Sequence, residues 1–207
     1  MISPHDDDYK QTKLIKRTGA QLASPFRELA DWVGANYGVH VLNVIYDTIT
    51  PDDRPRVNVV LETEEDEMMF RRGPLRSFNE IDQKRVQEQW VSILSQQRDR
   101  RFNVEGMFVI FGSFERVARE EANDNVTNEE ISRLKEILAN DALWEIDRCF
   151  DSVTFFFYTD AQVNQFKAAG LIEEYAREYA RIVQVHDEFA YLQKRGVAVY
   201  FDSKENF

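Results

Sequence analysis

Residues 153–166 combine an uninterrupted apolar run with an immediate helix start, and this combination constrains the fold more than any other feature. The run VTFFFY ends at Thr159, and Gln162 three residues later completes a pair of the kind that caps a helix N-terminus. Residues 57–70 repeat the pattern, with Thr63 at the offset of Thr159. Apolar strands that pass directly into helices predict a protein in which strands and helices alternate.

The first half of this pattern occurs four times along the chain. Apolar runs begin at positions 57, 107, 153 and 197, and each has a serine or threonine six residues later. Such spacing is expected from an internal duplication, but any series of alternating strands and helices also has fairly even spacing. Both interpretations stay open. A duplication would give halves of about residues 21–122 and 123–207.

The hydrophobic pattern predicts an α/β fold, with α+β as a variant. We expect one mixed sheet with an antiparallel hairpin at its start and right-handed helical crossovers between its later strands. The alternative is two ferredoxin-like halves side by side. The sheet would hold about five strands, near residues 39–49, 57–61, 107–112, 153–158 and 197–201.

Two further expectations concern organisation. Residues 1–20 are polar and show no periodicity, so we expect a flexible N-terminal arm followed by a single domain over residues 21–207. Leu143, Trp144 and Ile146 follow the helix that begins near Thr127, and they are interpreted as a second helical segment.

Composition excludes several classes of function. The net charge of -11 argues against a phosphate-binding surface for nucleic acid, which is built from Lys and Arg. The single cysteine excludes an intramolecular disulfide. The acidic N-terminal segment is unlike a signal peptide, and no run approaches the roughly 20 apolar residues of a membrane span. We therefore expect a soluble, cytoplasmic protein that binds neither nucleic acid nor membranes.

The motifs that identify catalytic or cofactor-binding proteins are missing from the sequence. There is no glycine-rich phosphate loop and no Gly-x-Ser-x-Gly nucleophile elbow. His186, Asp187 and Glu188 form the densest group of metal-ligand types, but neighbouring helical residues point about 100° apart and cannot converge on one ion. We expect no catalytic residue, no metal and no cofactor.

Two basic islands on this acidic chain are the first candidate site. They bracket the predicted helix at residues 77–97, and arginine is favoured at protein interfaces, so they are a candidate contact for an acidic partner or anion. The simpler interpretation is charge balance with nearby acidic runs. The islands consist of Arg71, Arg72 and Arg76, and of Arg98, Arg100 and Arg101.

Ser113 and Thr159 are the second candidate site. Each follows an apolar strand, and open α/β sheets bind ligands in the crevice at the carboxyl ends of their strands. Serine and threonine are also ordinary helix caps, which is the simpler interpretation.

These observations favour a protein-interaction or regulatory binding module without catalysis, whose partner is another protein. One alternative is an enzyme with a dispersed carboxylate and arginine site at the strand ends. Another is a small-ligand binding protein with an aromatic-lined pocket. The sequence gives no oligomeric state.

Overall fold

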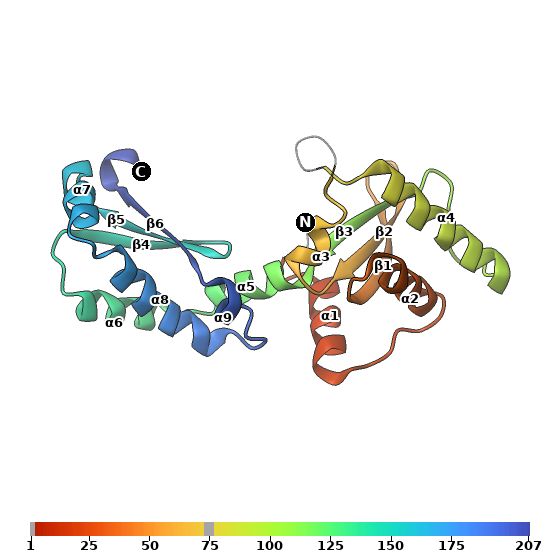
Figure 1. Cartoon of the computed structure of the whole chain (residues 1–207), viewed down its shortest axis with the longest axis horizontal. Helices are drawn as coiled ribbons and strands as arrows, with labels where there is room; N and C mark the ends of the chain where they lie inside the picture. Colours follow the sequence, from red (N-terminus) through yellow and green to blue (C-terminus); the bar gives the residue numbers. More distant parts are fainter. Residues whose placement is uncertain (1–2, 73–76) are drawn as a thin grey trace. The chain divides into compact units, whose positions relative to one another are not determined.

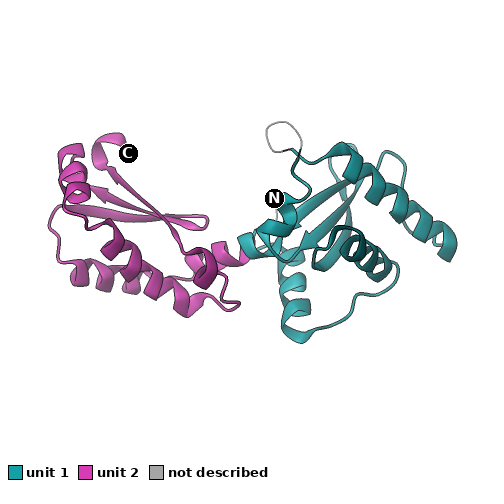
Figure 2. Cartoon of the chain, viewed as in Figure 1, with its two compact units in different colours: residues 1–116 teal, residues 117–207 magenta. Residues whose placement is uncertain are grey.

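The computed structural model describes residues 3–72 and 77–207, and this part of the chain mixes helices and strands as the sequence predicts (Figure 1). The chain divides into two compact units, residues 1–116 and 117–207 (Figure 2). The expectation of a single domain over residues 21–207 differs from this division. Each unit has its own sheet and its own hydrophobic core.

The elements of the first unit are, in order, α1 (Asp7–Thr18), α2 (Phe26–Tyr37), β1 (Val41–Ile49), β2 (Arg54–Leu61), α3 (Glu64–Met68), α4 (Glu80–Gln97) and β3 (Phe108–Ser113). Helix α5 (Phe114–Asp124) spans the division between the units. Those of the second unit are α6 (Asn128–Leu138), β4 (Leu143–Cys149), β5 (Ser152–Phe157), α7 (Asp160–Ala168), α8 (Ile172–His186), α9 (Leu192–Arg195), β6 (Ala198–Ser203) and the 3₁₀ turn η2 (Lys204–Asn206).

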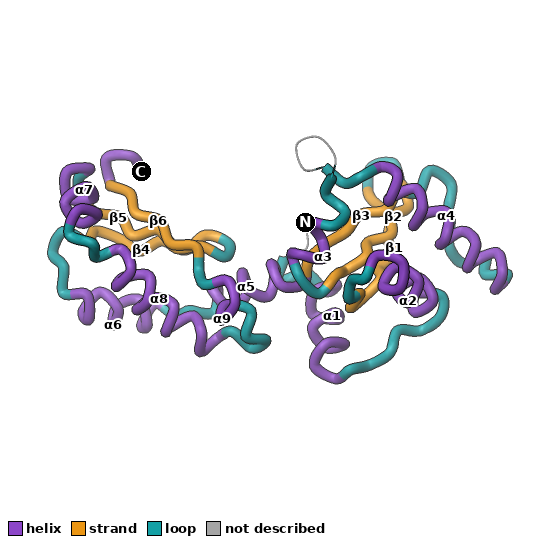
Figure 3. The backbone as a smooth tube through the Cα atoms, in the orientation of Figure 1, coloured by secondary structure: helices purple, strands orange, loops and turns teal. Residues whose placement is uncertain are grey.

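The first sheet has the strand order β1-β2-β3 (Figure 3). Strands β1 and β2 form the predicted antiparallel hairpin, and β2 pairs with β3 in parallel. A shift in register between Val41 and Asn43 marks a bulge in β1. The parallel pair places the carboxyl ends of β2 and β3 together, so Leu61 lies opposite Ser113.

The core of the first unit lies between one face of this sheet and the helices α2 and α4. Trp90 of α4 is fully buried, and its ring stacks on Phe26 at a centroid distance of 5.5 Å. Helix α2 ends at Gly38, which has φ 68° and adopts the left-handed conformation that a glycine accepts without strain.

Helix α1 covers the opposite face of the first sheet. Thr12 accepts a hydrogen bond of 2.9 Å from the side-chain amide of Asn43 on β1, and Tyr9 stacks on Phe114 at 5.3 Å. Tyr9 and Thr12 are both buried. The structure thus has a docked helix where we expected a flexible arm. Among the buried residues of α1, Tyr9 is the large one and Thr12 is polar, so the hydrophobic pattern gives no signal for this helix.

The second sheet has the order β4-β5-β6, again with an antiparallel hairpin followed by a parallel pair. A register shift between Leu143 and Glu145 places a bulge in β4. Phe157 lies opposite Ser203, as Leu61 lies opposite Ser113. The two sheets therefore share strand order, strand direction and the strand that carries the bulge.

The core of the second unit lies between one face of this sheet and helices α6, α7 and α8. Tyr175, Tyr179 and Val183 recur every four residues on α8 and form its buried face. Phe155 of β5 contacts both tyrosine rings and stacks on Phe201 at 5.5 Å.

Two details of the expected fold need correction. One sheet of about five strands is replaced by two sheets of three, and the parallel pair in each differs from a ferredoxin-like half. Residues 143–149 form a strand and not a helix. The bulge brings Leu143 and Ile146 to the same face of the sheet, so their three-residue spacing imitates a helical stripe. Within the described residues, no helix has the length and apolar character needed to cross a membrane.

Candidate functional site

The second arginine island lies in a hollow at the carboxyl end of α4. Arg98 ends this helix in the left-handed conformation, with φ 54°, and the chain then turns back through residues 99–104. The hollow measures about 550 Å³, and its apolar lining includes Leu94 and Phe102. Arg98 and Arg100 line it as well. The structure thus places two cationic side chains beside an apolar surface.

These two arginines differ from the third member of the island. Arg101 forms an ion pair of 2.6 Å with Asp99 and lies over the ring of Phe102 at 5.3 Å. Hydrogen bonds from Arg101, together with its charge, lower the pKa of Asp99. Arg98 and Arg100 form no ion pair with any residue in the ranges 3–72 and 77–207. The hollow therefore carries positive charge that this part of the chain does not neutralise.

Arg71 of the first island forms an ion pair within the described part of the chain, unlike Arg98 and Arg100. The guanidinium of Arg71 pairs with Glu67 at 2.6 Å and lies over the ring of Phe78 at 4.2 Å. Arg72 is exposed, and Arg76 lies outside the described residues. Arg71 and the second island lie near opposite ends of α4, which spans about 27 Å at 1.5 Å per residue, so they cannot contact the same small ligand.

Arg71 belongs to an ion cluster near the carboxyl ends of β2 and β3. The carboxylate of Glu67 is 4% exposed and binds Arg71 through one oxygen and Arg116, at 2.7 Å, through the other. Removing either guanidinium would leave the buried charge of Glu67 without full compensation, so both arginines are part of the fold. Glu115, which is also buried, accepts the backbone N–H of Glu64 at the start of α3.

A second charged cluster connects α1 to the sheet. Glu62, immediately after β2, binds Lys16 of α1 through one oxygen and His40 through the other. Burial opposes ionisation of Glu62, but hydrogen bonds and charges from Lys16 and His40 outweigh it and lower the pKa of the carboxyl group. No sequence motif indicates this cluster, because its members lie far apart in the chain.

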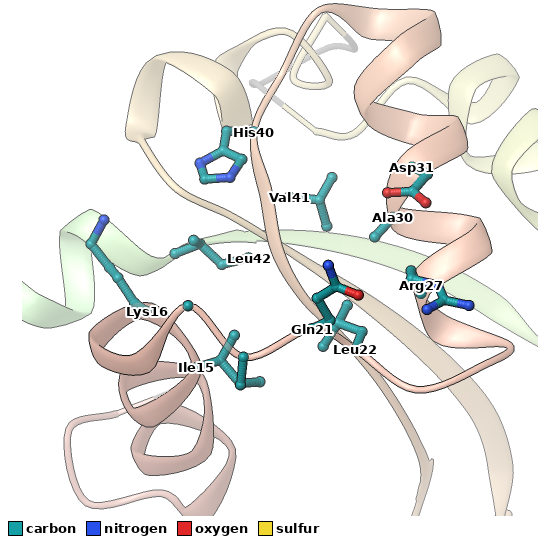
Figure 4. A pocket seen from close by; sticks show the side chains of 12 residues that line it. Ile15, Lys16, Gln21, Leu22, Arg27, Ala30, Asp31, His40, Val41 and Leu42 are labelled. Carbon is teal, nitrogen blue, oxygen red and sulfur yellow. The ribbon is translucent and has the colours of Figure 1, made fainter.

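Lys16 and His40 also line the second hollow of the first unit (Figure 4). It measures about 390 Å³ and lies between α1, the start of α2 and the start of β1. Arg27 and Asp31 of α2 line the opposite side of this hollow, and apolar side chains such as Leu22 form part of its wall. Cationic and anionic groups are both present, so this hollow has a mixed charge.

The two candidate hydroxyl residues belong to different units. Ser113 is buried at the end of β3, and its Oγ accepts the backbone N–H of Arg116 at 3.4 Å. Thr159 caps α7 by accepting the backbone N–H of Gln162 at 3.3 Å, and the Gln162 side chain accepts the backbone N–H of Thr159. Neither lines the hollow at the end of α4 or the hollow of Figure 4. Both hydroxyls accept hydrogen bonds at helix starts.

Among the residues that the structure describes, no three His, Cys, Asp or Glu side chains gather closely enough to hold a metal ion. Comparison with models of known protein families, with curated proteins and with solved structures found no match. We therefore infer function from the geometry of the hollows and from their charges.

Proposed function

We propose that the protein is a non-catalytic binding module that recognises an acidic segment of a partner protein through the hollow at the end of α4. One observation carries this proposal. Arg98 and Arg100 share the hollow with Leu94 and Phe102, and neither arginine has an ion-pair partner within the described ranges.

The chemistry of the hollow defines the partner. Guanidinium groups bind carboxylates with two parallel hydrogen bonds, and an apolar surface beside them favours a neighbouring leucine or phenylalanine. On a chain with net charge -11, a local positive site also steers an acidic segment toward one place, because the rest of the surface repels it.

Fluorescence anisotropy of a labelled peptide tests this proposal. The probe is a short peptide in which four glutamates are flanked by leucines, and the control probe replaces the glutamates with lysines. We expect the acidic peptide to bind the full chain and the basic peptide to bind at least tenfold more weakly. The affinity for the acidic peptide should fall as the salt concentration rises.

The decisive variant is R98N/R100A. Asparagine is chosen at position 98 because it tolerates the left-handed conformation at the end of α4. The matched control is R133A/R177A, which removes two exposed arginines from the second unit. We expect R98N/R100A to bind the acidic peptide at least tenfold more weakly than wild type, and the control variant to bind it with unchanged affinity. Equal affinity of wild type and R98N/R100A, or no binding by wild type, would overturn the proposal.

A small-ligand site is the second candidate, and the hollow of Figure 4 favours it. Its volume of about 390 Å³ lies in the usual range for small-molecule sites, and Arg27 lines it together with apolar side chains such as Leu22. A small aromatic carboxylate suits this combination. Titration of benzoate, followed by NMR, should shift signals of residues around Arg27 and leave those near Arg98 unchanged. Loss of these shifts in R27A but not in R133A would support the site, and no shift in wild type would exclude it.

A further inference from the structure

The strongest difference between the two units concerns the sheet face turned away from each core. In the first unit Asn43 pairs with Val60, and this face also carries Asn58. All three side chains are buried, with exposures of 2–3%. Helix α1 lies on this face, where Thr12 accepts a hydrogen bond from the side-chain amide of Asn43. Part of the first unit itself therefore covers this face.

The corresponding face of the second sheet is partly open. Glu145 pairs with Phe156, next to the bulge of β4 just as Asn43 and Val60 lie next to the bulge of β1. The neighbouring pair on this face joins Thr154 to Tyr200, whose side chain is 58% exposed. We call these four residues, with Asp147 and Asp202, the outer face of the second sheet.

Aromatic residues occupy part of this outer face without closing it. Trp144 and Phe207 contact the ring of Phe156 at centroid distances of 6.2 and 5.3 Å, and Phe207 is 78% exposed. A hollow of about 560 Å³ begins at Thr154 and Tyr200 and continues round the edge strand β6. Exposed aromatic residues beside a hollow are typical of docking surfaces.

We propose that the outer face of the second sheet binds an amphipathic helix of a partner protein, and that this helix carries basic residues along its flanks. The helical shape follows from the first unit, where a helix fills the equivalent place on a sheet of the same order and bulge position.

The charge of the partner follows from the rim of the outer face. Glu145, Asp147 and Asp202 all belong to this face, and only Glu145 has an ion-pair partner, Lys135, within the described part of the chain. Hydrogen bonds from Asn206 and the backbone N–H of Ser203, together with the charge of Lys167, lower the pKa of Asp202, and Lys167 also lines the hollow. Asp147 has no such cationic neighbour among the ion pairs of the described residues. A basic helix can neutralise such a rim, whereas an acidic helix would be repelled.

A synthetic peptide with the sequence of residues 3–20 is the probe, because α1 is a helix known to fit the equivalent face. Its four basic residues, Lys10, Lys13, Lys16 and Arg17, outnumber its three aspartates, and the control peptide replaces Lys10, Lys13 and Arg17 with glutamate. Binding of each labelled peptide to the full chain is followed by fluorescence anisotropy. We expect measurable binding of the first peptide and binding at least tenfold weaker for the acidic version.

Variants on the outer face locate the binding. D147K and Y200R should each weaken binding of the basic peptide at least tenfold, because both introduce positive charge at exposed positions. The matched control is V185R, which changes a residue of α8 that is 78% exposed. Unchanged thermal melting of each variant checks that the second unit stays folded.

Three results would overturn the proposal: no binding to wild type, equal binding to all variants, or equal binding of the acidic peptide. A concentration-dependent dimer that Y200R disrupts would instead assign the outer face to a second copy of the chain. These experiments are independent of the arginine hollow, since R98N/R100A should bind the basic peptide as wild type does.

Discussion

The hydroxyl of Tyr179 donates a hydrogen bond of 2.6 Å to Oδ1 of Asn123 in the buried centre of the second unit. The amide of Asn123 in turn donates to the backbone carbonyls of Phe150 and Ser152, at 2.8 and 2.9 Å. One polar side chain therefore joins α5, the β4–β5 hairpin and α8. Burial raises the pKa of Tyr179, which keeps the donating hydroxyl protonated.

Replacing Tyr179 with phenylalanine should destabilise the second unit. The change leaves a buried oxygen of Asn123 without its donor, which costs about 1–3 kcal/mol of unfolding free energy. Urea unfolding followed by circular dichroism measures the loss. Y158F is the matched control, because Tyr158 is 46% exposed and should tolerate the change. Equal destabilisation by both variants would contradict the role of the hydrogen bond.

Replacing Glu62 with glutamine should lower the stability of the first unit at neutral pH by about 1.5 kcal/mol, since hydrogen bonds to charged groups are lost. The pKa of Glu62 in the folded protein lies below its usual value of 4.5, so the contribution of Glu62 to stability is present above that value and is lost as the pH falls through the folded pKa. The difference between wild type and E62Q should therefore be full at pH 7 and shrink below about pH 4.5. Thermal melting between pH 3 and 7 measures it, and a constant difference would contradict the prediction.

Replacing Trp90 with phenylalanine should lower the free energy of unfolding only slightly, although Trp90 is fully buried. The indole N–H of Trp90 is buried and has no acceptor among the described residues, so its removal offsets part of the lost apolar contact. We expect a loss below about 2 kcal/mol for W90F and about 3–5 kcal/mol for W90A. Chemical unfolding compares them. A loss in W90F as large as that in W90A would contradict this explanation.

Replacing Thr159 with alanine should remove the cap of α7 and lower stability by about 1 kcal/mol, whereas T159S should retain it. Neither variant should alter binding of the acidic peptide, because Thr159 does not line the arginine hollow. Urea unfolding and anisotropy measure the two effects separately. If T159A lost peptide binding and T159S did not, Thr159 would again be a candidate site residue.

Local features of the fold could be predicted because they depend on neighbouring residues. The helix starts at Thr63, Thr127 and Thr159 follow from a hydroxyl side chain that accepts a backbone N–H three residues later. The stop at Gly38 follows from its left-handed conformation. The helical segment predicted around Leu143 was wrong, because the bulge in β4 changes the spacing of apolar residues along the strand.

For the candidate sites, too, positions along the chain could be predicted from the sequence, but contacts between distant residues could not. The sequence shows where the arginines lie, but it does not show that Glu67 neutralises Arg71 while Arg98 has no ion-pair partner within the described ranges. The cluster of Lys16, His40 and Glu62 depends on α1 lying against the sheet, and no local pattern indicates that contact.

By itself, the sequence determined the mixture of helices and strands, the antiparallel hairpin, most strand positions and the caps, because periodicity and capping act within a few residues. Only the tertiary structure decided that the strands divide between two sheets, that α1 covers one face of the first sheet and that the outer face of the second stays partly open. Those features depend on which apolar surfaces find each other across long stretches of chain, and this pairing is a property of the whole fold.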